Sequence, residues 1–327
     1  MKKLIAAYGL MLMACAADAP NSPSDGPPPP PPPPTDGPAP DPIARGKYLV
    51  ENVSGCVGCH TPRLATGALD QTKFLAGVQC FIDTAPADNN AGCLHTGNLT
   101  NHATGLATRS DAEIINMFQN GMRPDGTAMF ANMPYWVYHN RTASDAMAVV
   151  KYLRSVPGVD RTLPANQPPF ATRPASPAVP LADADIPKPT TANASTSNGR
   201  YLVAMAGRCI LCHTPLTNAQ NQRSLDLTKV LAGGRSFPGA PPLPAMVYAT
   251  NLTPHPTGLN GYTAEQIKAV LKTGLDKDNK RVCRPMPGGP MSEYGGLSDS
   301  DALDIGTYLT SLTPVANAIP NECSVAP

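Results

Sequence analysis

Aromatic residues are scarce in this chain of 327 residues, at 5% of the total with one Trp and six Phe. The length suits two domains of ordinary size, for which this is a small stock of large core side chains. Either the domains pack loosely, or a large apolar group that is not an amino acid fills their centres. A macrocyclic cofactor would be such a group.

Three further features are missing. The formal net charge is only +1, so the total charge indicates no nucleic-acid partner and no anionic membrane surface. The apolar stretch of residues 4–13 is too short to span a bilayer. Alternating strand patterns of useful length are absent, which predicts an all-α fold with long connecting loops.

The N-terminus indicates export. Lys2 and Lys3 precede the short apolar stretch, which ends in a small residue before Cys15. This pattern resembles a bacterial lipobox, so we expect residues 1–15 to be a signal peptide and Cys15 to carry a lipid anchor. The alternative is an ordinary signal peptide cut near Ala17 or Ala19. Either way the protein is exported, as a periplasmic protein or as a lipoprotein facing the periplasm or the cell exterior.

Proline, with 39 residues, is concentrated in two stretches. Residues 16–42 include eight consecutive prolines and predict an extended, disordered tether. Residues 161–197 form a second Pro-rich stretch, which we interpret as a linker. The domains then span residues 43–160 and 198–327.

These two domains are repeats of one another. Tyr48 and Tyr201 lie 153 residues apart, and the same offset separates His60 from His213. Other matched segments are Leu75-Ala76-Gly77 with Leu231-Ala232-Gly233, and Asn98-Leu99-Thr100 with Asn251-Leu252-Thr253. A repeat unit of this length is a domain rather than an element of a solenoid.

Helix signals occur at matched places in the repeats. Asp41 and Pro42 indicate a helix that begins at Pro42 and continues through Val53. The closing helices are predicted over residues 142–154 and 298–311. Two capping boxes and two glycine stops mark a middle helix in each repeat, at Ser110 with Glu113, Thr263 with Gln266, Gly121 and Gly274.

Each repeat contains Cys-x-x-Cys-His, the attachment signature of c-type haem. Two thiols on one helical turn add to the porphyrin vinyl groups, and the following His is placed under the iron. The sequence therefore predicts two covalently bound haem c groups, attached at Cys56, Cys59 and His60 and at Cys209, Cys212 and His213. A four-cysteine zinc site or a thiol-disulfide motif is the alternative.

Methionines at equal spacing are candidates for the second axial iron ligand. Met133 and Met286 each lie 73 residues after the His of their own repeat, and each precedes a proline. A thioether ligand raises the haem potential and closes the iron to small ligands, which suits electron transfer. The alternative is that these methionines only fill core space. Met129 and Met291 are the nearby rivals.

Besides Cys15, four histidines and four cysteines outside the motifs remain. His102 and His255 occupy matched positions; we expect them to be exposed or to touch a haem propionate rather than to bind iron. His95 and His139 have no matched partner and are given no role. The cysteines outside the motifs predict two disulfides, Cys80–Cys93 and Cys283–Cys323, with free buried thiols as the alternative.

The motifs together resemble class I cytochrome c domains, most of all those in the cytochrome subunits of bacterial membrane-bound alcohol and gluconate dehydrogenases. The resemblance covers residues 43–157 and 198–315. It implies two tandem all-α cytochrome c domains joined by a Pro-rich linker, with His60 and His213 as proximal ligands and Met133 as a distal ligand. It also implies that the first and last helices of each domain cross, at Gly46 and Tyr152 and at Gly199 and Tyr308.

The second repeat departs from this pattern after Met286. Gly288 stands where Met-Pro-Tyr has its tyrosine, and three extra residues precede the closing helix. The distal ligand of the second haem therefore stays open between Met286, Met291 and an unoccupied position.

The expected function is electron transfer between exported redox proteins, with the donor and acceptor unidentified. The alternative is an enzyme, either a dihaem peroxidase or a dihaem oxidoreductase acting on a small sulfur compound. Such an enzyme needs a haem with an open or displaceable sixth position, and the matched methionines argue against that.

Overall fold

The computed structural model describes residues 41–83, 92–218, 221, 223–238, 245–289, 292–320 and 324–325. Several predictions fall outside these residues. They are the signal peptide with Cys15, nearly all of the tether, the rival ligand Met291 and the disulfide partner Cys323. These stay predictions.

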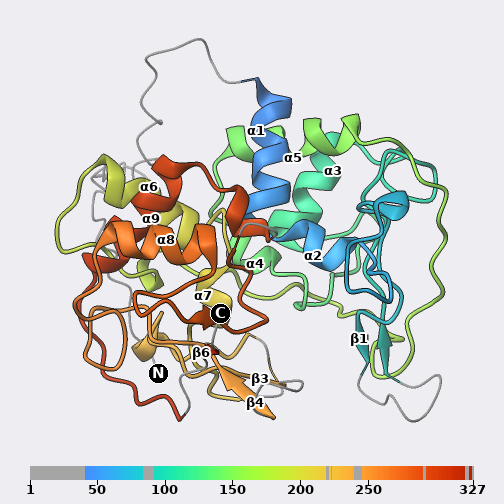
Figure 1. The fold of residues 1–327 in the computed structure, drawn as a ribbon. Coiled ribbons are helices and arrows are strands. Elements are labelled where there is room, and N and C mark those ends of the chain that lie inside the picture. The colour runs from blue at the N-terminus through green and yellow to red at the C-terminus, as the bar shows by residue number, and fades with distance from the viewer. Residues whose placement is uncertain are drawn as a thin grey trace, which may run out of the picture. The chain divides into compact units, whose positions relative to one another are not determined.

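Short helices joined by long loops make up the first repeat (Figure 1). Its helical segments, in chain order, are α1 (Pro42–Tyr48), the π-helix η1 (Leu49–Val53), α2 (Cys56–His60), the 3₁₀ turn η2 (Gln71–Lys73), α3 (Asp111–Ile115), the π-helix η3 (Asn116–Asn120), α4 (Tyr135–Tyr138) and α5 (Ala143–Ser155).

The second repeat follows a similar order, with single α-helices in the places where the first repeat has α1 with η1 and α3 with η3. Its segments are α6 (Ala194–Ala204), α7 (Cys209–Cys212), η5 (Leu227–Lys229), α8 (Ala264–Thr273), η6 (Glu293–Gly296) and α9 (Asp299–Thr310), and η4 (Asp183–Asp185) lies between the repeats. The 3₁₀ turn η6 therefore takes the place in the chain that α4 has in the first repeat.

The all-α prediction holds only in part, because the described residues include three antiparallel pairs of very short strands. These are β1 (Ile82–Asp83) with β2 (Cys93–Leu94), β3 (Ser236–Pro238) with β4 (Met246–Tyr248), and β5 (Arg281–Val282) with β6 (Ser324–Val325). Strands of two or three residues contain no alternation long enough to detect, and they pair because loop ends approach each other in space.

The predicted helix ends are confirmed. The Asp41 carboxylate accepts a hydrogen bond from the Ile43 amide, and α1 with η1 runs without a break from Pro42 to Val53. Both capping boxes form as predicted. Gly121 and Gly274 end their helices in the left-handed conformation, at φ 70° and 73°. Because these capping interactions form within one helical turn, they can be predicted from the local sequence.

Each repeat is closed by a helix crossing that only glycine allows. A Cβ on Gly46 in α1 would lie 1.9 Å from the Ala148 carbonyl oxygen in α5. A Cβ on Gly199 in α6 would lie 2.1 Å from the Asp304 carbonyl oxygen in α9. Figure 1 shows α1 against α5 and α6 against α9. The crossing implied by the resemblance is confirmed in both repeats.

A buried asparagine organises the long loop of each repeat. The Asn98 side chain accepts hydrogen bonds from the amide and hydroxyl of Thr100, at 3.0 and 2.8 Å, and donates to Thr104 and to the Val159 carbonyl oxygen. Asn251 makes the same four bonds in the second repeat. The shared Asn-Leu-Thr segment therefore has a structural cause: it ties the middle loop to the chain that leaves the closing helix.

Residues 161–197, predicted as a linker, pack against both repeats. Leu181 and Ile186 are buried in the common apolar core, and the α6 helix already begins at Ala194. The repeats also contact each other directly. The Tyr201 hydroxyl donates to Asp145 at 2.7 Å, and the Ser54 hydroxyl donates to the Ala206 carbonyl oxygen at 2.9 Å. All described residues consequently belong to one compact unit.

Candidate functional site

The two Cys-x-x-Cys-His motifs fold as short helices at equivalent places. Residues 56–60 form α2, and residues 209–212 form α7, with His213 directly after it. The four cysteines of the motifs are half-buried and form no disulfide. Because cysteines three residues apart share one helical turn, each pair can reach a single group from one side.

Both motif histidines are buried and oriented by the backbone. His60 is 7% exposed and His213 is 6% exposed. His60 Nδ1 lies 2.8 Å from the Gly97 carbonyl oxygen, and His213 Nδ1 lies 2.7 Å from the Thr250 carbonyl oxygen. A carbonyl oxygen only accepts, so Nδ1 carries the proton in each ring and Nε2 keeps its lone pair for a ligand.

Electrostatics keep these groups neutral. Burial lowers the pKa of His60 and of His213 below 6.5, although the backbone hydrogen bond opposes the shift. Burial also raises the pKa of the Cys56 and Cys209 thiols to about 11. A neutral imidazole and a neutral thiol are therefore buried at each motif. Such a donor set favours covalent attachment to an apolar group over binding of a small cation.

The segments after each motif are held in matching ways. The Thr61 hydroxyl accepts from the Leu75 amide at 3.0 Å, and the Thr214 hydroxyl accepts from the Leu231 amide at 3.1 Å. Both leucines adopt positive φ angles, 57° and 62°. A non-glycine residue in this region is uncommon, and its occurrence at equivalent positions shows that the two sites share their backbone geometry.

The candidate distal methionines lie on loops beside the core. Met133 is half-buried against the apolar core, one residue before the turn that starts α4. Met286 is also half-buried against that core, and its amide donates to the Cys283 carbonyl oxygen at 3.1 Å. The rival Met129 packs against the core as well. The choice between Met129 and Met133 as iron ligand therefore stays a prediction.

An apolar cavity adjoins the second motif. It is lined by Cys209 and by side chains from five other segments, namely Val53, Leu202, Leu271, Tyr294, Leu297 and Ile305. Val53 belongs to the first repeat, so both repeats build this wall. Cys209 beside an apolar lining fits covalent attachment of an apolar group such as haem, and His213 follows in the same motif. The described residues hold no cluster of His, Cys, Asp and Glu that would suit the alternative zinc site.

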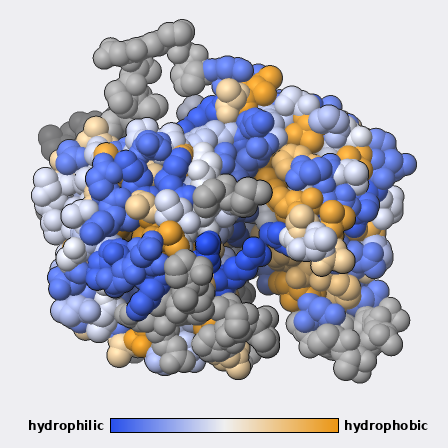
Figure 2. Space-filling view, in the orientation of Figure 1, coloured by the Kyte–Doolittle hydropathy of each residue, from blue (hydrophilic) through white to orange (hydrophobic). Residues whose placement is uncertain are grey.

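Apolar surface lies beside the first motif. Figure 2 shows apolar residues gathered over the half of the molecule that contains α2 and α3 in Figure 1, whereas hydrophilic residues predominate over α6, α8 and α9. The exposed side chains Leu64 and Phe81 belong to the first repeat. Apolar surface of this kind beside the motif suits contact with an apolar cofactor edge or with a partner protein.

The matched histidines His102 and His255 are half-buried and form local hydrogen bonds. Each Nδ1 lies 2.9 Å from a threonine hydroxyl two residues on, Thr104 in the first repeat and Thr257 in the second. They sit in the loop organised by the buried asparagine. This local bond gives the pair a structural reason for their matching positions.

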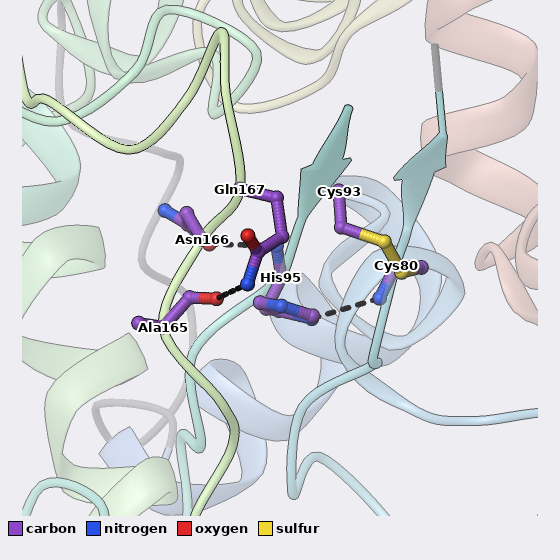
Figure 3. The surroundings of a disulfide bond; sticks show 6 residues. All are labelled: Cys80, Cys93, His95, Ala165, Asn166 and Gln167. Carbon is purple, nitrogen blue, oxygen red and sulfur yellow. Dashed lines mark hydrogen bonds between the residues drawn. A yellow bond between two sulfur atoms is a disulfide. The ribbon is translucent and has the colours of Figure 1, made fainter. Parts of the chain in front are cut away.

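The predicted Cys80–Cys93 disulfide is confirmed. It joins the segment just before β1 to the first residue of β2 (Figure 3). His95, for which no role was predicted, accepts a hydrogen bond through Nδ1 from the Cys80 amide at 2.9 Å. Its own amide donates to the Asn166 side chain at 2.9 Å, so the segment between the repeats is anchored here. Cys283 is also disulfide-bonded; its predicted partner Cys323 lies outside the described residues.

Sequence reasoning missed a charged pair between the two motifs. Arg208 Nη2 donates to Glu293 Oε2 at 2.8 Å, and Glu293 Oε1 accepts from the Gly58 amide inside the first motif at 3.0 Å. One signal was available, because Arg208 directly precedes Cys209 where the first repeat has Gly55. Glu293 falls in the stretch that departs from the first repeat.

Comparison with known proteins gives the family context. The chain is 28% identical over 284 residues to the cytochrome c subunit of an alcohol dehydrogenase (quinone) from Gluconacetobacter polyoxogenes, covering 84% of this chain and 56% of that protein. It is 25% identical over 297 residues to the gluconate 2-dehydrogenase cytochrome c subunit of Pantoea cypripedii, covering 83% of this chain and 59% of that protein. These relatives support a cytochrome c family.

A shorter match comes from Cereibacter sphaeroides, whose diheme cytochrome c-type protein is 29% identical over 118 residues, 36% of each chain. No family model matches the chain. The chain spans a little over half the length of the dehydrogenase subunits it matches. In the ranges that the structure describes, every helix is too short or too polar to cross a bilayer.

Proposed function

We propose that the protein is a dihaem c-type cytochrome that transfers electrons between exported redox proteins. One observation carries the proposal. Two thiols on one turn are followed by a buried imidazole whose Nδ1 is held by a backbone carbonyl oxygen, and this arrangement occurs twice. When bound, haem supplies a one-electron couple; the chain attaches it, orients its iron ligand and surrounds it with apolar side chains.

Export is part of the proposal. The Cys80–Cys93 disulfide fits an oxidising compartment, whereas the motif cysteines stay free for thioether formation. A lipid anchor at Cys15 would then hold the cytochrome at a membrane surface. Labelling with a radioactive fatty acid should mark the unaltered protein and leave a Cys15→Ser variant unmarked.

Haem attachment is tested by mass spectrometry of protein exported by cells that mature cytochromes c. We expect a mass increase of two haems, reduced to one in Cys56→Ser/Cys59→Ser and likewise in Cys209→Ser/Cys212→Ser. Protein that matures beside a co-expressed known cytochrome c and still carries no haem would refute the proposal.

The second axial ligand is tested by the weak near-infrared band of ferric haem with methionine ligation. We expect Met133→Ala and Met286→Ala each to remove about half of the band, because each repeat contributes one ligated iron. Met129→Ala and Met291→Ala are the matched controls. Loss of the band in a control instead would reassign the ligand. High-spin resting protein with rapid peroxide turnover would favour a dihaem peroxidase.

The relatives indicate a class of electron donor. Two of them are named as cytochrome c subunits of dehydrogenases, so we propose that an exported dehydrogenase reduces this protein. Rapid mixing of the oxidised cytochrome with a quinone-dependent alcohol dehydrogenase catalytic subunit and its alcohol should reduce both haems. Gluconate 2-dehydrogenase with gluconate is the parallel test, and failure with both would exclude these donors.

A further inference from the structure

The two motifs are joined through charged side chains. Arg208, the residue before Cys209, reaches across to the first motif, where a Cβ on Gly55 would lie 2.1 Å from Arg208 Nε. Glu293 reaches the same motif, where a Cβ on Gly58 would lie 2.6 Å from Glu293 Oε1. The two glycines of the first motif therefore leave the space that the second repeat's charges occupy.

These charges are largely removed from water. The side chains of Arg208 and Glu293 are 23% and 13% exposed, and they form an ion pair at 2.8 Å. Arg208 Nε is buried and has no hydrogen-bond partner. A buried charge of this kind is costly unless it is paired, so each member of the pair depends on the other.

Both charged side chains lie at the Cys-x-x-Cys-His motifs. Glu293 Oε1 accepts a hydrogen bond from the Gly58 amide of the first motif at 3.0 Å, and Arg208 directly precedes Cys209 of the second. Glu293 begins η6, seven residues after Met286, and therefore lies on the loop of the candidate distal ligand. The pair thus touches the first motif, the second motif and the second methionine loop.

We propose that Arg208 and Glu293 form a compensated ion pair between the two haem sites, in which each charge cancels the effect that the other alone would have on the reduction potentials. The inference rests on the proposed function. Oxidation of a haem adds one positive charge, so an uncompensated Arg208 disfavours the ferric form and an uncompensated Glu293 favours it. Compensation within the pair cancels these opposite effects.

The test uses Glu293→Gln, which removes the charge and keeps an oxygen that can accept from the Gly58 amide. An uncompensated, partly buried unit charge beside a redox centre, at an effective dielectric constant of about 20, changes the oxidation equilibrium by roughly tenfold. We therefore expect at least one midpoint potential to rise by about 59 mV in Glu293→Gln, since tenfold corresponds to this value for one electron.

Arg208→Met should lower a midpoint potential by a similar amount, and the double variant Arg208→Met/Glu293→Gln should return both potentials close to those of the unaltered protein. Asp111→Asn is the matched control, because it breaks the Arg154–Asp111 ion pair of 2.9 Å between α3 and α5, which contacts neither motif. Spectroelectrochemical titration measures all potentials, and mass spectrometry counts the haems. The double variant also supplies a folded form if a single variant is unstable.

The outcomes separate the two ideas. Two haems with opposite shifts in the single variants and recovery in the double variant would support charge compensation within the pair. Two haems with unchanged potentials in both single variants, even with lowered stability, would overturn it and leave electron transfer intact. Absence of haem from the unaltered protein would overturn the proposed function and this inference with it.

Discussion

Replacement of Asn98 by alanine would remove four hydrogen bonds from one buried position of the first repeat. Asn98 is 7% exposed, and its bonds to Thr100, Thr104 and Val159 range from 2.8 to 3.2 Å. A typical intramolecular hydrogen bond contributes about 1 kcal/mol net, and a buried partner left unsatisfied adds to the loss. We expect Asn98→Ala to lower the free energy of unfolding by about 3 kcal/mol, because the threonine hydroxyls can rotate toward other acceptors.

Asn251→Ala tests the same reasoning in the second repeat. Asn251 is fully buried and makes four equivalent bonds, at 2.8 to 3.1 Å, so we expect a loss of similar size. Asn98→Asp keeps the two acceptor contacts and loses the donors, and it should fall between Ala and the unaltered protein. Asn120→Ala, at an exposed position, is the control and should change stability by less than about 0.5 kcal/mol.

Guanidinium unfolding of the haem-loaded protein measures these differences through circular dichroism and through the single tryptophan, Trp136. Trp136 is buried in the first repeat, so its fluorescence reports on that repeat in particular. Losses below about 1 kcal/mol for both Asn98→Ala and Asn251→Ala would refute the view that this asparagine organises the loop. A large effect in only one repeat would show that the matched bonds do not contribute equally.

Two further predictions concern helix packing. Gly46→Ala and Gly199→Ala should each destabilise the protein by at least about 2 kcal/mol, since the added Cβ meets a backbone carbonyl. Gly97→Ala, with open space around its Cβ, is the control. Thermal unfolding measures the differences. Burial alone would raise the pKa of Asp145. The hydrogen bond and the charge of Arg45 together lower this pKa by more, so the net value lies below 3.8. Asp145→Asn should therefore cost about 2 kcal/mol at pH 7. This difference shrinks as the pH falls below about 4, because the Asp145 carboxylate takes up its proton first in the unfolded chain and only at lower pH in the folded protein. A difference that stays constant down to pH 2 would contradict the assigned charge effect.

The sequence predicted the features that depend on local chemistry. Helix caps such as Ser110 and glycine stops such as Gly121 act within one turn, and the structure has them where the sequence places them. The helix crossing at Gly46 followed from the family resemblance. The Cys80–Cys93 disulfide followed from counting cysteines in an exported chain, and it is present.

The remainder depends on contacts between residues far apart in the chain. The π-helical end of the first helix and the two-residue strands have no distinctive sequence pattern. The buried positions of Leu181 and Ile186 within the proposed linker arise because both repeats offer them an apolar surface. The hydrogen bond between Glu293 and Gly58 joins residues that are 235 positions apart in the chain, and no sequence pattern at either residue predicts it.

The most informative differences between the repeats lie where the repeats touch. Ser54 and Gly207 occupy equivalent positions, 153 residues apart, and the Ser54 hydroxyl bonds to the carbonyl oxygen just before Gly207. At the next equivalent position Gly55 faces Arg208, and a second arginine, Arg141, donates to the same carbonyl oxygen at 2.8 Å. Duplication alone would give two identical sites with identical surroundings. Because the charged residue occurs on one side and glycine on the other, the contact joins the two sites and gives them different surroundings.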